Sequence, residues 1–276
     1  DFKKLMASIA AKEDGFGVAI QILYMRLFSL GSDKKPVSEV ERDVARLLLP
    51  EAMFDDKKNR EPHMLAEVVR LCLRNPEDTE LAMGICQRLL AAIGEWKVAP
   101  WDFSEVVTEL AASFPRVVLE AAFEPDEAEA GSRRGLFGHF RESRPCPLRK
   151  IADDELLGWA LERPETRFPA LAASVLGWTG TKSDLIRDIA PEDEDETRGL
   201  KWTPTALRLI HEAPNPVVVL KEFEENFRPS SWSGSLAEIL SRREALILAL
   251  ADDPDQRIRD WVQAAIPKLR DEVEAT

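Results

Sequence analysis

The chain has 276 residues, of which 45% are hydrophobic and 32% are charged. This mixture is typical of a folded globular protein and excludes an intrinsically disordered chain. The formal net charge of −13 repels phosphate backbones at long range, so nucleic-acid binding would need a local basic patch.

The apolar runs are short, as at Val217–Leu220, whereas a membrane-spanning helix needs about 20 apolar residues. We therefore expect no membrane segment. The chain begins at Asp1 and has no basic and apolar leader, so we expect no secretory signal. The missing Met at position 1 fits either a piece of a longer protein or ordinary processing. Cys72, Cys86 and Cys146 lack the spacing of a zinc site or a disulfide framework, which favours a reducing, cytoplasmic setting.

Apolar residues recur at steps of three and four along most of the chain, which is the periodicity of amphipathic helices. The first half has such a stripe at Leu65, Val68, Val69, Cys72 and Leu73. The Val217–Leu220 run is the one β-like segment, but it follows Asn215-Pro216 and is interpreted as a helix start. The helices that we expect before the recurring turns cover 16–30, 65–74, 103–113, 153–162, 202–212 and 236–250.

Prolines after short polar turns mark a repeat along the chain. They are Pro36, Pro76, Pro115, Pro164, Pro214 and Pro254, separated by 40, 39, 49, 50 and 40 residues. Each proline is predicted to open a helix, and another helix precedes each of them. A unit of helix, tight turn and helix with a period near 40 is typical of two-helix repeat arrays.

The segment 251–269, "ADDPDQRIRDWVQAAIPKL", resembles the second helix of HEAT repeats. In that family, an Asp-rich turn with Pro precedes an aliphatic–Arg pair, small residues and Leu. The matching residues here are Asp252, Asp253, Pro254, Ile258, Arg259, Ala264, Ala265, Ile266 and Leu269. The resemblance implies an all-α fold, an α-α superhelix or HEAT-like solenoid of about six helix pairs, which works as a scaffold or binding surface.

Two stretches interrupt the helical pattern. Residues 124–150 form a loop that is long for a turn within an array. It separates N-terminal helical repeats at 1–123 from HEAT-like repeats at 151–276, in what we expect to be one continuous solenoid. The second stretch is the acidic run "PEDEDET" at 191–197.

The 124–150 loop supplies most of the candidate binding residues, because arginines alternate with aromatic rings there. Such a mixture can contact phosphates and stack on bases, or dock on an acidic protein surface. Trp232 in a Ser/Gly-rich link, with Arg228 nearby, is a further candidate anchor for a protein partner. The candidate binding residues are Arg133, Arg134, Phe137, His139, Phe140, Arg141, Arg144, Arg228 and Trp232.

No motif specifies a reaction, so we predict no catalytic residue, no metal site and no cofactor. The glycines of "GSRRGLFG" lack the spacing of a phosphate-binding loop, and His63, His139 and His211 belong to no metal-ligand motif. The acidic groups Asp153–Glu155 and Asp252-Asp253 lie at expected helix starts, where we interpret them as N-caps. Trp261 lies on an apolar stripe and is predicted to be buried.

The sequence therefore predicts a non-catalytic protein-binding, scaffold or sensor module, cytoplasmic and bacterial, within a larger multi-domain protein. The expected partner is another protein, or another region of the full-length chain. The alternative is a nucleic-acid-binding protein similar to the HEAT-like alkylation-repair glycosylases, which the net charge of −13 disfavours.

Overall fold

The structure is a computed structural model. It describes residues 1–52, 54, 62–95, 97–99, 102–124, 147–179, 199–228 and 234–276. The regular structure of these residues is thirteen α-helices, three short 3-10 turns and one pair of two-residue strands. The predicted all-α class is thereby confirmed. The chain forms two compact units, Asp1–Ala152 and Asp153–Thr276.

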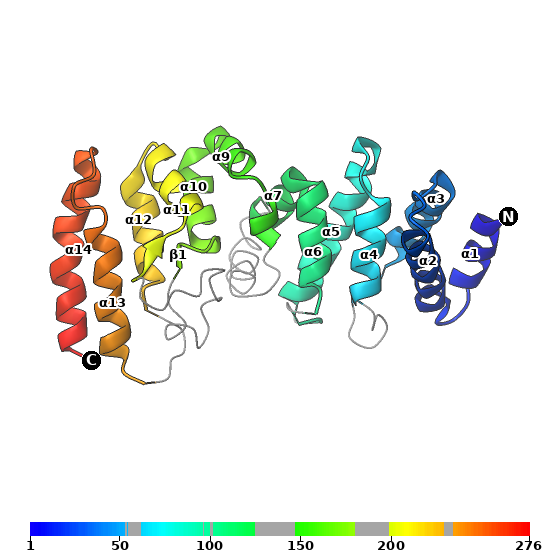
Figure 1. Ribbon diagram of the computed structural model, residues 1–276, viewed down its shortest axis with the longest axis horizontal. Coiled ribbons are helices and arrows are strands. Elements are labelled where there is room, and N and C mark those ends of the chain that lie inside the picture. The colour runs from blue at the N-terminus through cyan, green and yellow to red at the C-terminus, as the bar shows by residue number, and fades with distance from the viewer. Residues whose placement is uncertain are drawn as a thin grey trace. The chain divides into compact units, whose positions relative to one another are not determined.

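In the first unit, each helix packs against the helix after it or the helix two places further along (Figure 1). Helix α1 contacts α3 and α5 contacts α7, while α4 contacts both α2 and α6. The elements are α1 Phe2–Ala10, α2 Gly15–Ser32, α3 Glu39–Leu48, η1 Leu49–Glu51, α4 Pro62–Cys72, η2 Pro76–Asp78, α5 Thr79–Gly94, α6 Ser104–Ser113, α7 Pro115–Phe123 and η3 Pro147–Lys150.

The second unit repeats this pattern. Helix α10 packs on α12 and α12 on α14, while α9 contacts α11. Two short strands pair antiparallel, with Trp178 opposite Trp202 and Thr179 opposite Lys201. The elements are α9 Asp153–Glu162, α10 Pro164–Ser174, β1 Trp178–Thr179, β2 Lys201–Trp202, α11 Pro204–Glu212, α12 Pro216–Glu225, α13 Leu236–Leu248 and α14 Gln256–Glu274.

All six helices predicted before the turns are present, with small differences at their ends. The largest difference is at 65–74, where helix α4 begins at Pro62 and ends at Cys72, while at 202–212 Trp202 belongs to β2 and helix α11 begins at Pro204. The apolar stripes are the faces that the helices bury: Leu65, Val68, Val69, Cys72 and Leu73 are all inaccessible to solvent. The predicted burial of Trp261 is also confirmed, since only 6% of it is exposed.

The prediction that each recurring proline opens a helix is only partly right. Pro115 and Pro164 are first residues of α7 and α10, and Pro76 opens the 3-10 turn η2. Pro36, Pro214 and Pro254 instead lie two or three residues before α3, α12 and α14. At α3 and α14 the N-cap positions belong to Ser38 and Asp255, and a cap residue must precede the first helical residue.

The acidic groups predicted as N-caps contact neighbouring helices instead. Asp153 Oδ1 accepts a hydrogen bond from Thr205 Oγ1 at 2.8 Å, and Asp154 Oδ1 accepts one from Arg208 at 2.7 Å. Asp253 is buried and pairs with His211 Nε2 at 2.8 Å, while the true cap of α14 is Asp255. These carboxylates therefore join successive helix pairs.

Hydrogen bonds to backbone carbonyls join the hairpins in both units. In the first, Arg88 of α5 donates to the carbonyl of Leu49 at 3.1 Å and to that of Pro50. In the second, Arg257 of α14 donates to the carbonyl of Pro214 at 2.7 Å. Each arginine thus provides a hydrogen-bond donor for a turn carbonyl that lies 38 or 43 residues earlier in the chain.

One helix of the described residues, Gly15–Ser32, has the length and composition of a weak membrane-span candidate. It packs against α1, α3 and α4 through Ala19, Ile20, Leu23 and Leu27. Core helices of globular proteins pass the same test of length and composition, so we describe α2 as a helix of the first unit.

Candidate functional site: a groove between α12 and α14

Of the predicted binding residues, only Arg228 lies in a described part of the chain. The basic residues and aromatic rings from Arg133 to Arg144 lie within 125–146, and Trp232 lies within 229–233, both outside the described residues. The last residues of the predicted 124–150 loop, Pro147–Lys150, form η3, which packs on α6.

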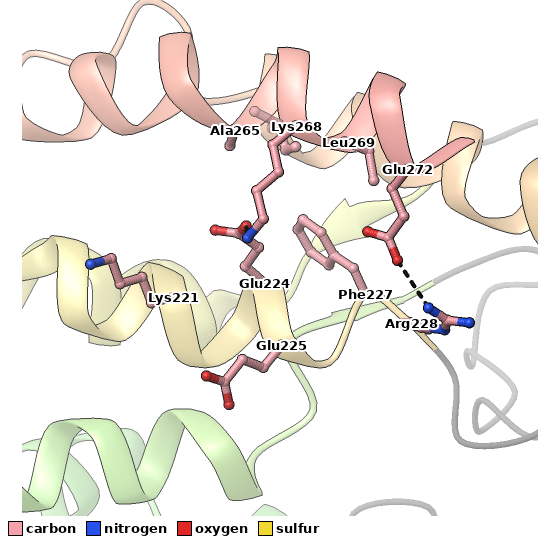
Figure 2. A pocket seen from close by; sticks show the side chains of 10 residues that line it. Lys221, Glu224, Glu225, Phe227, Arg228, Ala265, Lys268, Leu269 and Glu272 are labelled. Carbon is pink, nitrogen blue, oxygen red and sulfur yellow. Dashed lines mark hydrogen bonds and ion pairs between the residues drawn. The ribbon is translucent and has the colours of Figure 1, made fainter. Parts of the chain in front are cut away.

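Arg228 lies at the mouth of a groove of about 350 Å³ between α12 and α14 (Figure 2). The floor is apolar and consists of Phe227, Ile247, Ala265 and Leu269, all of which are buried. Amphipathic packing explains this position, because the floor residues belong to the faces that α12, α13 and α14 turn toward one another. The rim is charged and consists of Lys221, Glu224, Glu225, Arg228, Lys268 and Glu272.

Two ion pairs join the helices across the groove. Lys268 Nζ lies 2.5 Å from Glu224 Oε1, and Arg228 Nη1 lies 3.5 Å from Glu272 Oε1. Trp261 Nε1 also donates to Glu224, at 3.2 Å. Lys268 and Arg228 are more than half exposed, so each pair contributes little to stability and can exchange partners at low cost.

The floor of the groove rests on a cluster of aromatic rings. The Phe227 ring lies 5.4 Å from that of Trp178 and 6.4 Å from that of Trp202. Trp202 Nε1 donates to the carbonyl of Leu246 at 2.8 Å, which fixes β2 against α13. Packed aromatic rings of this kind give the groove a rigid base.

The described lining of the groove consists of apolar, lysine, arginine and glutamate side chains, without Ser, Thr, Cys or His. The hydrogen bond to Glu224 raises the pKa of Lys268, which keeps the amine protonated and unreactive. Among the described residues, no group of three His, Cys, Asp or Glu side chains could hold a metal ion.

The histidines of the described residues are engaged in contacts between helices. His63 of α4 lies 3.0 Å from Glu105 of α6, and its ring packs edge-on against Tyr24. His211 of α11 pairs with buried Asp253.

Sequence reasoning missed all rim residues except Arg228. A signal was present, because Lys221, Glu224, Glu225 and Arg228 recur at three- and four-residue steps, although α12 ends at Glu225 and only the first three lie on it. Nothing in the sequence indicates that Lys268 and Glu272, more than 40 residues away, lie opposite them. No protein-family model matches this chain, and comparisons with curated proteins and with solved structures also find no match.

Proposed function

We propose that the chain is a non-catalytic protein-binding or scaffold module, built as a HEAT-like α-solenoid. The order of the helix contacts supports this architecture, since helices pack on those one or two places away in the chain. Stacked repeats have this contact pattern, because each hairpin buries its apolar faces only against its neighbours.

The recurring bonds between hairpins support the same architecture. Arg88 donates a hydrogen bond to a turn carbonyl 38 residues earlier in the chain, and Arg257 donates one to a turn carbonyl 43 residues earlier. His211 and Asp253 are 42 residues apart, and Trp202 and Leu246 are 44 apart. These separations are close to the period of the proline pattern, as equivalent positions in successive repeats would be.

The observation that carries the binding function is the groove between α12 and α14. It combines a buried apolar floor with a rim of exchangeable ion pairs. Protein interfaces have this composition, with a desolvated apolar centre and a polar edge. Charged groups of the partner would take over the contacts of Lys268 and Arg228 at the rim, above the floor that Phe227 and Leu269 close. The partner is another protein or another region of the full-length chain.

The experiment is an affinity measurement with purified partner, identified first by cross-linking and pull-down from the native cytoplasm. Arg228→Glu combined with Lys268→Glu reverses two rim charges and should weaken binding by at least about tenfold. Arg270→Glu is the matched control, because Arg270 lies on the same helix and pairs with Glu244, at 2.5 Å, outside the groove lining. Equal weakening by both variants, or by neither, would contradict the role of the groove.

A gel-shift titration separates this function from nucleic-acid binding. At about 0.15 M salt we expect no shift of single- or double-stranded DNA or RNA, because the net charge is −13. Binding that weakens steeply as salt rises would replace the protein-binding proposal with the alternative similar to alkylation-repair glycosylases.

A further inference from the structure

Helix α2 has an apolar side that the described residues of its own unit leave exposed. Val18, Met25 and Phe28 are 50%, 55% and 61% exposed, although such residues are normally buried. At 100° per residue the three positions fall within about 80° of one another around the helix axis, opposite the buried Leu23 and Leu27. We call these three residues the α2 stripe. Leu5, on the adjacent α1, is 56% exposed as well.

The α2 stripe lies on a helix that carries almost no charge. Arg26 is the single charged residue between Gly15 and Ser32. Its guanidinium is already engaged, since Nε donates to Glu41 at 2.6 Å and the group lies 4.6 Å from the centre of the Phe2 ring. By contrast, the exposed side of α14 carries charges such as Arg257, Asp260 and Arg270. An uncharged apolar surface favours an equally uncharged apolar partner.

We propose that the α2 stripe is the contact surface between two copies of this chain. In an antiparallel arrangement about a twofold axis near the middle of α2, Val18 of one copy faces Phe28 of the other. Met25 of each copy then faces Gln21 of the other. Such a self-complementary contact needs no second surface, since the same residues serve on both sides.

The distribution of charge favours a second copy of this chain as the partner of the α2 stripe. Residues 153–276 contain 25 acidic and 15 basic side chains, whereas residues 1–152 contain 25 acidic and 22 basic ones. Two copies repel each other least when they approach through the first unit, because its charges nearly balance. The α2 stripe is an exposed apolar surface of that unit.

The size of the surface predicts a weak dimer. An 18-residue helix is about 27 Å long and about 10 Å wide, and the shorter α1 adds about half as much, which gives roughly 400 Å² per copy. Both copies together bury about 800 Å², which is below the roughly 1,200 Å² of standard specific interfaces and within the range of weak, transient contacts. The two copies should therefore be in concentration-dependent equilibrium, with a Kd on the order of 10–100 µM.

The test is analytical ultracentrifugation of the chain from about 1 µM to about 500 µM, a range that brackets this Kd. The average mass should rise from one chain toward two, and more readily at high salt, which screens the repulsion between acidic units. Met25→Glu combined with Phe28→Glu should weaken the dimer by at least about tenfold, since it buries carboxylates in the contact. Leu248→Glu is the control, because Leu248 is 50% exposed on α13 and should leave the dimer unchanged.

Circular dichroism of the double variant checks its fold, which exposed substitutions should preserve. A chain that stays monomeric over the whole range overturns the proposal, as does a dimer that the control weakens equally or the double variant leaves intact. Flotation with phosphatidylcholine vesicles that depends on Met25 and Phe28, from a chain that remains monomeric, would assign the α2 stripe to lipid and also overturn it.

Discussion

Glu41 is a buried residue whose carboxyl group has a pKa below the ordinary value of a glutamate. Burial by itself would raise its pKa, but hydrogen bonds from Ser38, from Arg26 and from backbone N–H groups outweigh this and lower the pKa below its ordinary value. Because the pKa is lower in the folded state than in the unfolded one, the ionised group stabilises the fold above the unfolded pKa of about 4.3. That contribution is lost as the pH falls through the folded pKa.

We therefore expect Glu41→Gln to lower the free energy of unfolding by about 2 kcal/mol at pH 7. The difference from the unmodified chain should shrink as the pH falls below about 4.3, where the Glu41 carboxylate of the unfolded chain begins to bind a proton before that of the folded chain does. Urea unfolding at several pH values measures both effects. Glu13→Gln, at an exposed turn position, should change the free energy of unfolding little. A difference in this free energy for Glu41→Gln that stays constant down to pH 3 would contradict the stabilising role of ionised Glu41.

The thiol of Cys72 should be unreactive toward alkylating reagents in the folded chain. It is fully buried, and this burial raises the pKa of its thiol to about 12. At pH 8 its thiolate fraction is then about a thousandfold lower than that of a free cysteine. Alkylation followed by peptide mass spectrometry should find Cys72 labelled only after denaturation. Labelling at the rate of a free thiol under native conditions would show that α4 opens readily.

At the residue scale, the sequence predicts which kind of residue stands at a helix start better than it predicts which residue that side chain contacts. The acidic groups at 153–155 and 252–253 were recognisable as helix-start residues, because Asp and Glu favour first turns. Their actual contacts are Thr205, Arg208 and His211, which are 42 to 54 residues away. Local propensity carries no information about such pairs.

At the scale of elements, helix α11 depends on one threonine at its start. Thr203 Oγ1 accepts a hydrogen bond from the Ala206 N–H at 3.1 Å and donates one to the carbonyl of Leu176 at 2.8 Å. The cap thus also joins α11 to the segment that follows α10. Ser235, by comparison, caps α13 through a single bond to the Glu238 N–H, at 3.2 Å.

Thr203→Ala should consequently cost about 2 kcal/mol of unfolding free energy, against about 1 kcal/mol for Ser235→Ala. Thr203→Ser keeps the hydroxyl and should recover most of the loss. Thermal or urea unfolding of the three variants provides the comparison. Equal costs for both alanine variants would mean that the bond to Leu176 contributes nothing.

The helices were predictable from sequence because each has an apolar side of helical period, as at Leu65–Leu73 in α4. Their ends were less predictable, since a proline can open a helix, as Pro164 does, or precede its cap, as Pro254 does. The groove was not predictable, because it needs α12 and α14 side by side, and periodicity does not specify which helices meet.

At the scale of the whole molecule, the chain divides into two compact units, so we expect a defect in one unit to stay local. A methyl group at Gly177 would lie 2.9 Å from the Phe223 ring in the second unit. Gly177→Ala should therefore destabilise that unit by about 1–3 kcal/mol. Gly158→Ala has open space in α9 and should stabilise it by up to about 1 kcal/mol.

Hydrogen exchange read by mass spectrometry locates these effects. In the Gly177→Ala variant, amide protection should fall in α9–α14 and stay unchanged in α1–α7. Protection that falls equally in both units would show that the whole chain unfolds as one cooperative body, contrary to the division at Ala152 and Asp153.

Because Thr179 pairs with Lys201, the two ends of the segment between them are held next to each other. Lengthening a segment whose ends are held together in this way costs little, about 0.6 kcal/mol for each doubling of its length. A reporter peptide or an epitope inserted between Thr179 and Lys201 should therefore leave the helices of the second unit folded.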